Sequence, residues 1–257
     1  MPEIHHTAIV SPQSDLAEEV VVGPYAIIGD HVRIGKGTRI GSHAHLTGWT
    51  EIGEDCIVHT GAVLGSDPQD LKFKGERSFV KIGDRNVFRE YTTVNRAEGE
   101  DKETIIGDDN YFMAYSHIAH NCHLGNNIIM ANCASLAGHV RIDDRAILGG
   151  LVGVHQFVHI GCMAMVGGLT KVVQDVPPYM LVNGIPARIF GINGVGLRRL
   201  GISLSVRDEL KRAYKVLCKE GMNVSQALEA IAKEEFKADE IALLVKFITS
   251  SSRGIIR

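Results

Sequence analysis

The chain has 257 residues, a net charge of −3, 45% hydrophobic residues and 22% charged residues, which is ordinary for a globular protein with a sizeable core. The acidic balance and the lack of a recognised module argue against nucleic-acid binding, and no run of about 18 apolar residues offers a membrane span. The start of the chain lacks the features of a signal peptide, and the five cysteines form no CxxC pair. We therefore expect a cytoplasmic protein without disulfides or stable membrane insertion.

Aliphatic residues recur every six positions from the start of the chain. A period of six does not fit an α-helix, but it fits a short strand followed by a corner, and three such units make one triangular coil. The sequence therefore predicts a mainly β, left-handed parallel β-helix, and by analogy such prisms associate as homotrimers. The first uninterrupted ladder is Ile4, Val10, Leu16, Val22, Ile28, Ile34, Ile40, Leu46, Ile52, Val58 and Leu64.

Two segments interrupt the ladder with charged residues. The six-residue step reaches Asp70, Glu76 and Glu100, and charges are costly in a dry core. We expect a β-helix over residues 1–177 with external loops near 66–81 and 97–105. Loops that project from a rigid scaffold commonly carry function.

The sequence becomes helical after the prolines at 177 and 178. We expect a linker and a C-terminal helical domain over 178–257, with a capping box formed by Ser205 and Asp208 at its first helix and further helices near 224–236 and 238–250. Residues 188–257 contain 13 Lys and Arg against 8 Asp and Glu. Such a basic region favours association with an acidic partner.

Histidines gather at equivalent positions of successive coils. In a coil of eighteen residues, His120, Gly138 and Gln156 share one column, and His139 and His155 lie in the columns beside it. Histidine is the usual general base near neutral pH, and a glycine stacked over it lets a backbone N–H approach a reacting oxyanion. The column is a candidate catalytic edge.

A metal site is the competing interpretation of these histidines. His117, His120 and His123 are three residues apart, a spacing that would group them on a helix. In a period-six coil, His117 and His123 instead fall on adjacent faces, so one chain would not bring all three to one ion.

Six segments of the chain form a distinctive set outside the plain repeat: PQDLKFKGE (68–76), SHIAHNCHLGN (116–126), LAGHV (136–140), VHQF (154–157), QDVPPY (174–179) and GLRR (196–199). Together they resemble the UDP-N-acetylglucosamine O-acyltransferase family, which catalyses the first step of lipid A synthesis. The resemblance covers essentially the whole chain. It implies transfer of an (R)-3-hydroxyacyl group from acyl carrier protein to the glucosamine 3-hydroxyl of the UDP-sugar, with no metal or redox cofactor, and it gives the basic tail an acidic partner.

The same resemblance assigns roles to single residues. It implies that His120 is the general base and that the N–H of Gly138 stabilises the oxyanion. Acyl length would depend on a groove that Gly168 leaves open and Lys171 narrows, for a chain of roughly 12 to 14 carbons. The residues implied for binding sugar nucleotide or acyl donor are Gln69, Asp70, Lys72, His117, His139, His155, Gln156, Asn193 and Arg199.

The chain departs from the family pattern beside the implied base. The following residue is commonly Asp in the family and is Asn121 here. An amide can orient an imidazole but has no charge to stabilise an imidazolium. A 3-amino sugar analogue, which needs less help from a base, therefore stays open as the acceptor. Three further hypotheses compete with this function: a related β-helix N-acyltransferase, a zinc hydratase and a non-catalytic trimeric scaffold.

Overall fold

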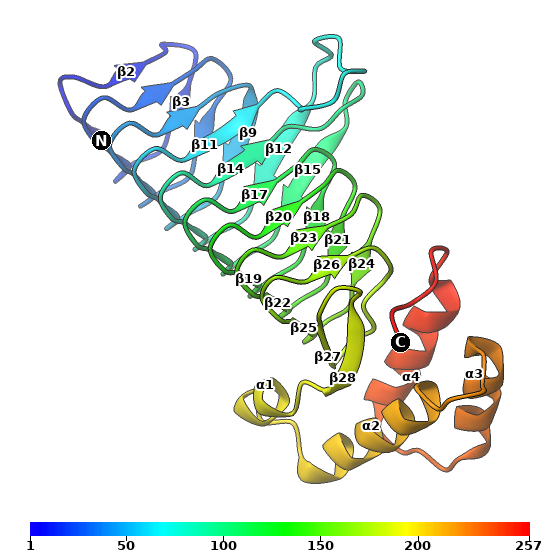
Figure 1. The fold of residues 1–257 in the computed structure, drawn as a ribbon. Coiled ribbons are helices and arrows are strands. Elements are labelled where there is room, and N and C mark those ends of the chain that lie inside the picture. Colours follow the sequence, from blue (N-terminus) through cyan, green and yellow to red (C-terminus); the bar gives the residue numbers. More distant parts are fainter.

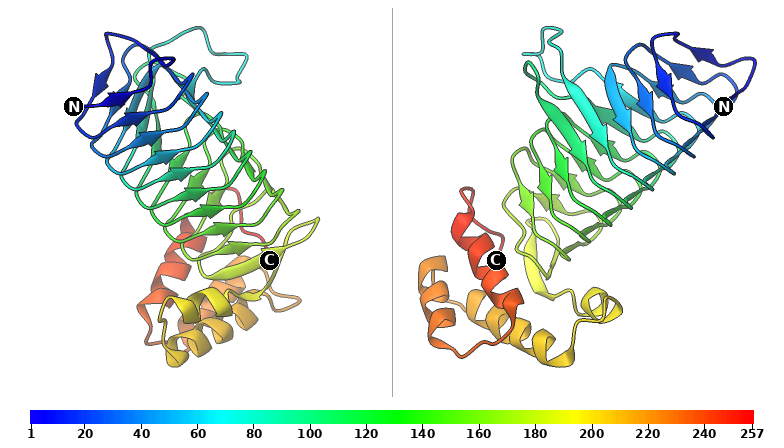
Figure 2. Two further views of the ribbon diagram at one scale, coloured as in Figure 1. Left: turned by 90° about the vertical axis from the view of Figure 1, so that its left-hand side faces the viewer. Right: turned by 180° about the vertical axis from the view of Figure 1, so that it is seen from behind.

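The computed structural model covers residues 1–257 and shows a three-sided prism of stacked coils followed by four helices (Figures 1 and 2). Each side of the prism is one sheet, and its strands are parallel except for the final pair. The predicted left-handed parallel β-helix with a helical C-terminal part is confirmed. None of its helices has the length and apolar character needed to cross a bilayer.

The three sheets are called sides A, B and C. Side A contains β1 (Glu3–Ile4), β4 (Val21–Val22), β7 (Arg39–Ile40), β10 (Ile57–Val58), β13 (Val87–Phe88), β16 (Tyr111–Phe112), β19 (Ile129–Met130), β22 (Ile147–Leu148), β25 (Met165–Val166), β27 (Met180–Asn183) and β28 (Arg188–Ile192). Side B contains β2 (Ile9–Val10), β5 (Ile27–Ile28), β8 (His45–Leu46), β11 (Val63–Ser66), β14 (Thr93–Asn95), β17 (His117–Ile118), β20 (Ser135–Leu136), β23 (Gly153–Val154) and β26 (Lys171–Val172). Side C contains β3 (Asp15–Leu16), β6 (Arg33–Ile34), β9 (Trp49–Ile52), β12 (Phe79–Ile82), β15 (Glu103–Ile106), β18 (His123–Leu124), β21 (Arg141–Ile142) and β24 (His159–Ile160).

The aliphatic ladder forms the interior of the prism. Most strands have two residues, of which the second points inward and is buried, as Ile118 and Leu136 are. Phe88 and Phe112 stack in successive coils with ring centroids 5.0 Å apart. The chain turns most corners through a residue with positive φ, such as Asn121 at 57° and His139 at 61°, a conformation that Asn and His tolerate better than most residues.

Strand register shows where extra residues leave the prism. Ile129 pairs with Ile147, eighteen residues on. Phe79 instead pairs with Trp49 and with Glu103, at separations of 30 and 24 residues. The residues beyond the eighteen of a regular coil form two external loops at 67–78 and 96–102. The first loop projects away from the coils (Figure 1, cyan).

Buried Arg96 anchors the first loop to the prism. Its guanidinium donates two hydrogen bonds to Asp67 Oδ1, at 3.0 and 2.7 Å, and one to the carbonyl of Glu76 at 2.8 Å. It also lies over the ring of Phe73, 4.8 Å from the centroid. Both ends of the loop are thereby fixed, which sets the position of Asp70 between them.

The end of the prism differs from the sequence-based expectation in two details. Side A continues past the two prolines, because β27 pairs with β25 and then forms a hairpin with β28. The first long helix is capped by Ser203, whose side chain accepts from the N–H of Val206, and Ser205 is inside the helix. The helices are α1 (Gly194–Arg199), α2 (Leu204–Leu217), α3 (Val224–Lys233) and α4 (Asp239–Ser250).

The last helix and the C-terminal segment return to the wall of the prism. The ring of Phe247 lies 4.5 Å from that of His159. Ser251 donates a hydrogen bond to buried Asp175 at 2.6 Å, and the N–H of Asp175 bonds to the carbonyl of Gly254 at 3.0 Å. The tail therefore lies against the same coils that carry the histidine column.

Candidate functional site

A pocket of about 860 Å³ lies along the corner between sides B and C. The corner after β17 supplies His120, the corner after β20 supplies Gly138, and the corner after β23 supplies Gln156. Loop 67–78 closes one flank. The predicted site residues that line this pocket are Gln69, Asp70, Lys72, His117, His120, Gly138, His155, Gln156 and Lys171.

The side-chain amide of Asn121 selects the tautomer of the neutral His120 ring. Asn121 Oδ1 lies 2.8 Å from His120 Nδ1 and accepts a hydrogen bond from the N–H of Glu98 at 2.9 Å. Nδ2 of Asn121 donates a hydrogen bond to the carbonyl of Glu98 at 3.1 Å, so the amide oxygen and nitrogen can be told apart. Since Asn121 Oδ1 accepts, Nδ1 of His120 donates, and the lone pair of the neutral imidazole lies on Nε2.

Gly138 lies directly against the ring of His120. A Cβ at this position would come within 2.5 Å of both Cε1 and Nε2 of His120, far inside carbon–carbon contact distance. The N–H of Gly138 donates no hydrogen bond within the chain. An imidazole lone pair and an unpaired amide donor thus share one small region of the pocket.

A carboxylate approaches the imidazole from the loop. Asp70 Oδ2 is 3.9 Å from Nε2 of His120, and Oδ1 accepts from the N–H of Lys72 at 2.9 Å. The imidazole side chain is 12% exposed and that of Asp70 is 27% exposed. Asp70 therefore places a negative charge where an imidazolium would form.

His117 is a neutral residue of the pocket wall. Its Nδ1 is hydrogen-bonded to the Thr93 hydroxyl at 2.7 Å. Burial, and then the positive charge of a protonated His120, lower the pKa of His117 below its ordinary value. Near neutral pH it can hydrogen-bond a ligand without bringing a charge.

We expect the substitution His117→Gln to reduce the acid sensitivity of the fold. Below about pH 6.5 the unfolded chain binds a proton at His117 that the folded protein binds only at lower pH, so the free energy of unfolding falls as pH falls through this range. Glutamine can keep the bond to Thr93 but does not titrate. Urea unfolding gives the free energy of unfolding at about pH 7.5 and about pH 5.5. The drop in this free energy between the two pH values should be smaller in the variant than in the parent, and an equal drop would contradict this explanation.

His139 lies at the same corner, on the side of His120 that faces a neighbouring pocket. Its ring stacks on Phe157 at 4.6 Å and meets the ring of His120 edge-on at 5.3 Å. Burial, followed by the charge of His120, lowers the pKa of His139. It faces a neighbouring pocket that it shares with Glu98 and Asn121.

Other candidates lie away from this corner. Asn193 caps α1 by accepting from the N–H of Gly196 at 3.1 Å and donates to the carbonyl of Met163 at 2.9 Å. Arg199 is in the last turn of α1. Gly168 is outside the pocket lining, and a Cβ on it would lie 3.2 Å from the carbonyl oxygen of Gly150.

The three histidines considered as a metal site, His117, His120 and His123, do not lie on one face of the prism. His117 is on side B and His123 is on side C.

The structure adds two residues that the sequence did not reveal. Glu98, in loop 96–102, lies within 4.8 Å of His120 and His139, measured between possible ligand atoms. Arg253 reaches back from the tail, with Nη2 3.3 Å from Nδ1 of His155 and 3.2 Å from the carbonyl of Val173. Neither position falls in the stacked columns or in the segments of family resemblance, which were the signals for most of the other candidates.

Comparisons with known proteins agree with this architecture. Residues 175–256 match the model of domain 2 of UDP-N-acetylglucosamine O-acyltransferase, and residues 31–66 and 103–138 match the bacterial transferase hexapeptide model. The acyl-[acyl-carrier-protein]–UDP-N-acetylglucosamine O-acyltransferase of Burkholderia orbicola is 51% identical over 262 residues, covering 100% of both chains.

Two further comparisons extend this result. The same-named protein of Gloeothece citriformis is 47% identical over 174 residues, which span 68% of this chain and 63% of that relative. The solved structure of LpxA from Acinetobacter baumannii superposes with a TM-score of 0.95 at 41% identity and covers 99% of each chain. The chain belongs to the family of acyl-carrier-protein-dependent UDP-N-acetylglucosamine O-acyltransferases.

Proposed function

We propose that the protein transfers an (R)-3-hydroxyacyl group from acyl carrier protein to the 3-hydroxyl of UDP-N-acetylglucosamine. The observation that carries this proposal is the imidazole of His120 beneath the unpaired N–H of Gly138, inside a pocket that also presents Asp70. Acyl transfer needs a base for the attacking hydroxyl and a donor for the oxyanion, and these two groups supply them.

In the first step, Nε2 of His120 takes the proton of the sugar hydroxyl while its oxygen forms a bond to the thioester carbon. The electron pair of the carbonyl moves to its oxygen, which the N–H of Gly138 stabilises. The tetrahedral intermediate then expels the carrier thiolate, which recovers the proton from the imidazolium. Asn121 keeps the ring oriented through Nδ1, and Asp70 offsets the imidazolium charge.

The remaining pocket residues surround this reacting centre. Gln69, Asp70 and Lys72 lie on the loop flank, and His155 and Gln156 lie one coil beyond Gly138. We assign them to binding the sugar nucleotide or the acyl donor, together with His117 and His139, which stay neutral near pH 7 because their pKa values are lowered.

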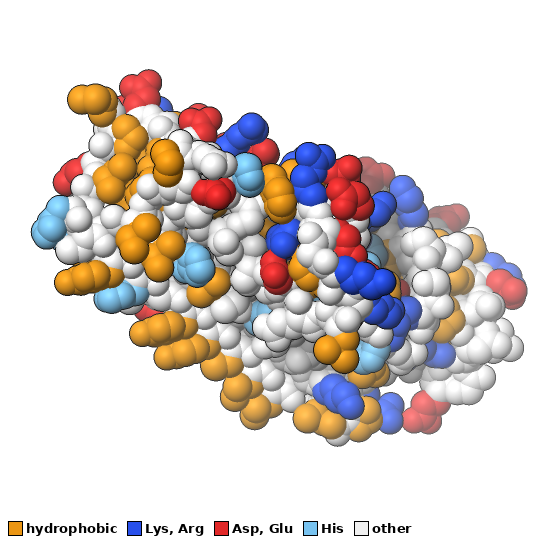
Figure 3. Space-filling view, turned by 90° about the horizontal axis from the view of Figure 1, so that it is seen from above, with side chains coloured by type: hydrophobic (Ala, Val, Ile, Leu, Met, Phe, Trp, Pro, Cys, Tyr) orange, Lys and Arg blue, Asp and Glu red, His pale blue; other side chains and the backbone are white.

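The assembly that we propose is a homotrimer with sites between neighbouring copies. Asn193 and Arg199 lie outside the pocket of their own chain, and we assign them to the nucleotide end of a ligand held in the pocket of a neighbouring copy. Hydrophobic side chains gather along one long edge of the prism (Figure 3). Large exposed apolar residues at the corner between sides A and B are Tyr25, Tyr91, Tyr115, Leu151 and Leu169.

The basic residues after position 188 support a dock for the acidic carrier protein. Arg198 and Arg199 are in the last turn of α1, and Lys215 is in the last turn of α2. Complementary charge of this kind raises association rates and is screened by salt.

A transfer assay with purified protein, UDP-N-acetylglucosamine, its 3-amino analogue and carrier-bound acyl donors tests this function. We expect an ester product with the plain sugar. Exclusive use of the 3-amino analogue would favour the amine acceptor, which needs less of a base and would suit an uncharged Asn121. No product with either sugar would contradict acyl transfer.

Acyl length offers a second test at Lys171. His117, Ser135, Gly153 and Lys171 occupy matching positions of successive side-B strands, and a Cβ on Gly153 would meet nothing within 4 Å. The groove therefore has free space over Gly153, and the side chain of Lys171 on the next strand limits the length of acyl chain that fits.

We expect Lys171→Ala to shift preference from roughly 12 to 14 carbons toward longer donors, by up to about fourfold in kcat/KM for each methylene that becomes buried. Lys171→Met keeps the length without the charge and should retain the original preference. A series of carrier-bound donors measures both variants. An unaltered length profile in Lys171→Ala, or a wild-type optimum of 10 carbons or fewer, would contradict this assignment.

A further inference from the structure

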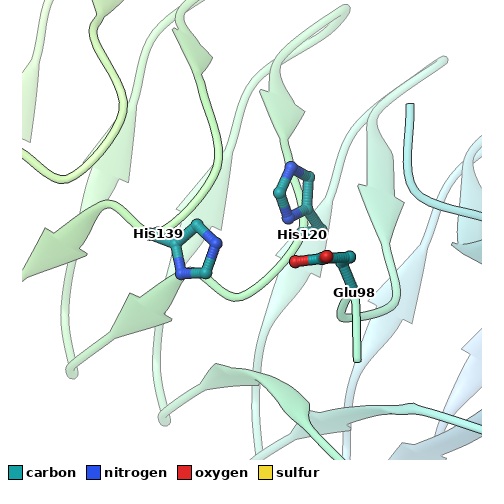
Figure 4. Close-up of side chains that lie close together, drawn as sticks. All are labelled: Glu98, His120 and His139. Atoms are coloured by element: carbon teal, nitrogen blue, oxygen red, sulfur yellow. The ribbon is translucent and has the colours of Figure 1, made fainter. Parts of the chain in front are cut away.

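Three potential metal ligands converge beside the proposed reacting centre. A carboxylate oxygen of Glu98 and one ring nitrogen each from His120 and His139 all lie within 4.8 Å of one another. Figure 4 shows the three side chains directed toward a common space from loop 96–102 and two successive corners. Two imidazoles and one carboxylate are a donor set that suits Zn²⁺.

The geometry requires little adjustment to hold a cation. Zinc bonds of about 2.0 to 2.2 Å in tetrahedral geometry place neighbouring ligand atoms about 3.4 Å apart, so each pair must approach by no more than roughly 1.5 Å. Rotation of the half-buried Glu98 side chain about its bonds can supply much of that movement.

Neighbouring contacts already orient the three ligands. The ring of His139 is stacked on Phe157. Asn121 bonds to His120 Nδ1 and holds both the N–H and the carbonyl of Glu98, so one amide fixes two ligands relative to each other. Such second contacts are typical of metal-binding histidines.

We propose that Zn²⁺, or a transition cation of similar preference, binds between Glu98, His120 and His139 and inhibits the enzyme. A neutral imidazole has one nitrogen lone pair. When the metal takes the lone pair of His120, the other nitrogen carries the proton and no base remains for the sugar hydroxyl. The inhibition rests on the function proposed above, whereas metal binding does not.

Binding is tested on the full-length protein, stripped with chelator, by titrating zinc against a fluorescent zinc indicator. We expect one high-affinity zinc per chain. Glu98→Gln removes a charged ligand and should weaken binding at least about tenfold, since even the loss of a second contact costs 10- to 100-fold. Glu100→Gln is the matched control on the same loop, because its carboxylate accepts from the N–H of Arg77 and is not part of the cluster.

Inhibition is measured as the zinc concentration that halves acyl transfer, relative to the metal-free rate of each variant. It should rise in Glu98→Gln in parallel with the dissociation constant and stay unchanged in Glu100→Gln. Equal zinc affinity in all three proteins, undiminished or increased transfer at saturating zinc, or inhibition insensitive to Glu98 would each overturn the proposal. If the metal-free protein transfers no acyl group, the proposed function fails, and the binding measurements still decide whether the metal site exists.

Discussion

Replacing His120 with alanine is expected to lower kcat/KM for acyl transfer by about 10³-fold, within the 10²- to 10⁴-fold range of general-base catalysis. The lone pair on Nε2 is the base nearest to the unpaired N–H of Gly138, and Asp70 at 3.9 Å is outside hydrogen-bond range of that nitrogen. Steady-state transfer of a carrier-bound acyl chain measures the loss.

His45→Ala is the matched control for this variant. His45 lies on β8 of the same side B and is not part of the pocket lining. Both variants should keep the circular dichroism and the oligomeric size of the parent, because neither ring is part of the buried ladder. Retention of more than about a tenth of kcat/KM in His120→Ala would exclude His120 as the general base.

The substitution Gly138→Ala should reduce kcat by about 10²-fold with little change in affinity for the sugar nucleotide. The added methyl would lie 2.5 Å from two atoms of the His120 ring, so the ring must move and its 2.8 Å bond to Asn121 must distort. A displacement of about 1 Å at a reacting group can cost this much rate.

Gly153→Ala separates this effect from a general effect of adding a methyl group to the pocket. Gly153 also lines the pocket, in the proposed acyl groove, but its added Cβ would meet no protein atom within 4 Å and would not touch the His120 ring. With short acyl donors kcat should therefore stay near the parent value, whereas the loss in Gly138→Ala should appear with every donor. Isothermal titration with UDP-N-acetylglucosamine gives the affinities. A Gly138→Ala enzyme with unaltered kcat would show that the contact between residue 138 and the imidazole does not matter.

The coil architecture could be predicted because one simple rule governs it. An aliphatic residue at every sixth position fills the interior of the prism. Where a charged residue takes that position, as Asp70 and Glu100 do, the chain forms an external loop. The end of the prism was less predictable. Pro177 and Pro178 suggested termination, yet the next strand pairs with β25 in side A. A proline can precede a strand without donating to its ladder.

The proposed catalytic column could be predicted by the same arithmetic, because positions eighteen residues apart stack in adjacent coils. His120 and Gly138 meet at one corner for that reason. Residues that approach from outside the prism obey no such rule. Glu98 reaches the corner through an external loop, and Arg253 approaches His155 from 98 residues further along the chain. Asn193 illustrates a related difficulty, because its side chain caps a helix and capping leaves the same sequence signature as binding.

The most direct test is the crystal structure of the protein with its acylated sugar-nucleotide product. We expect the 3-oxygen of the sugar about 2.6 to 3.2 Å from Nε2 of His120 and the acyl carbonyl oxygen about 2.7 to 3.1 Å from the N–H of Gly138, with the acyl chain directed toward Lys171. A product whose ester group lies away from both residues would contradict the proposed mechanism.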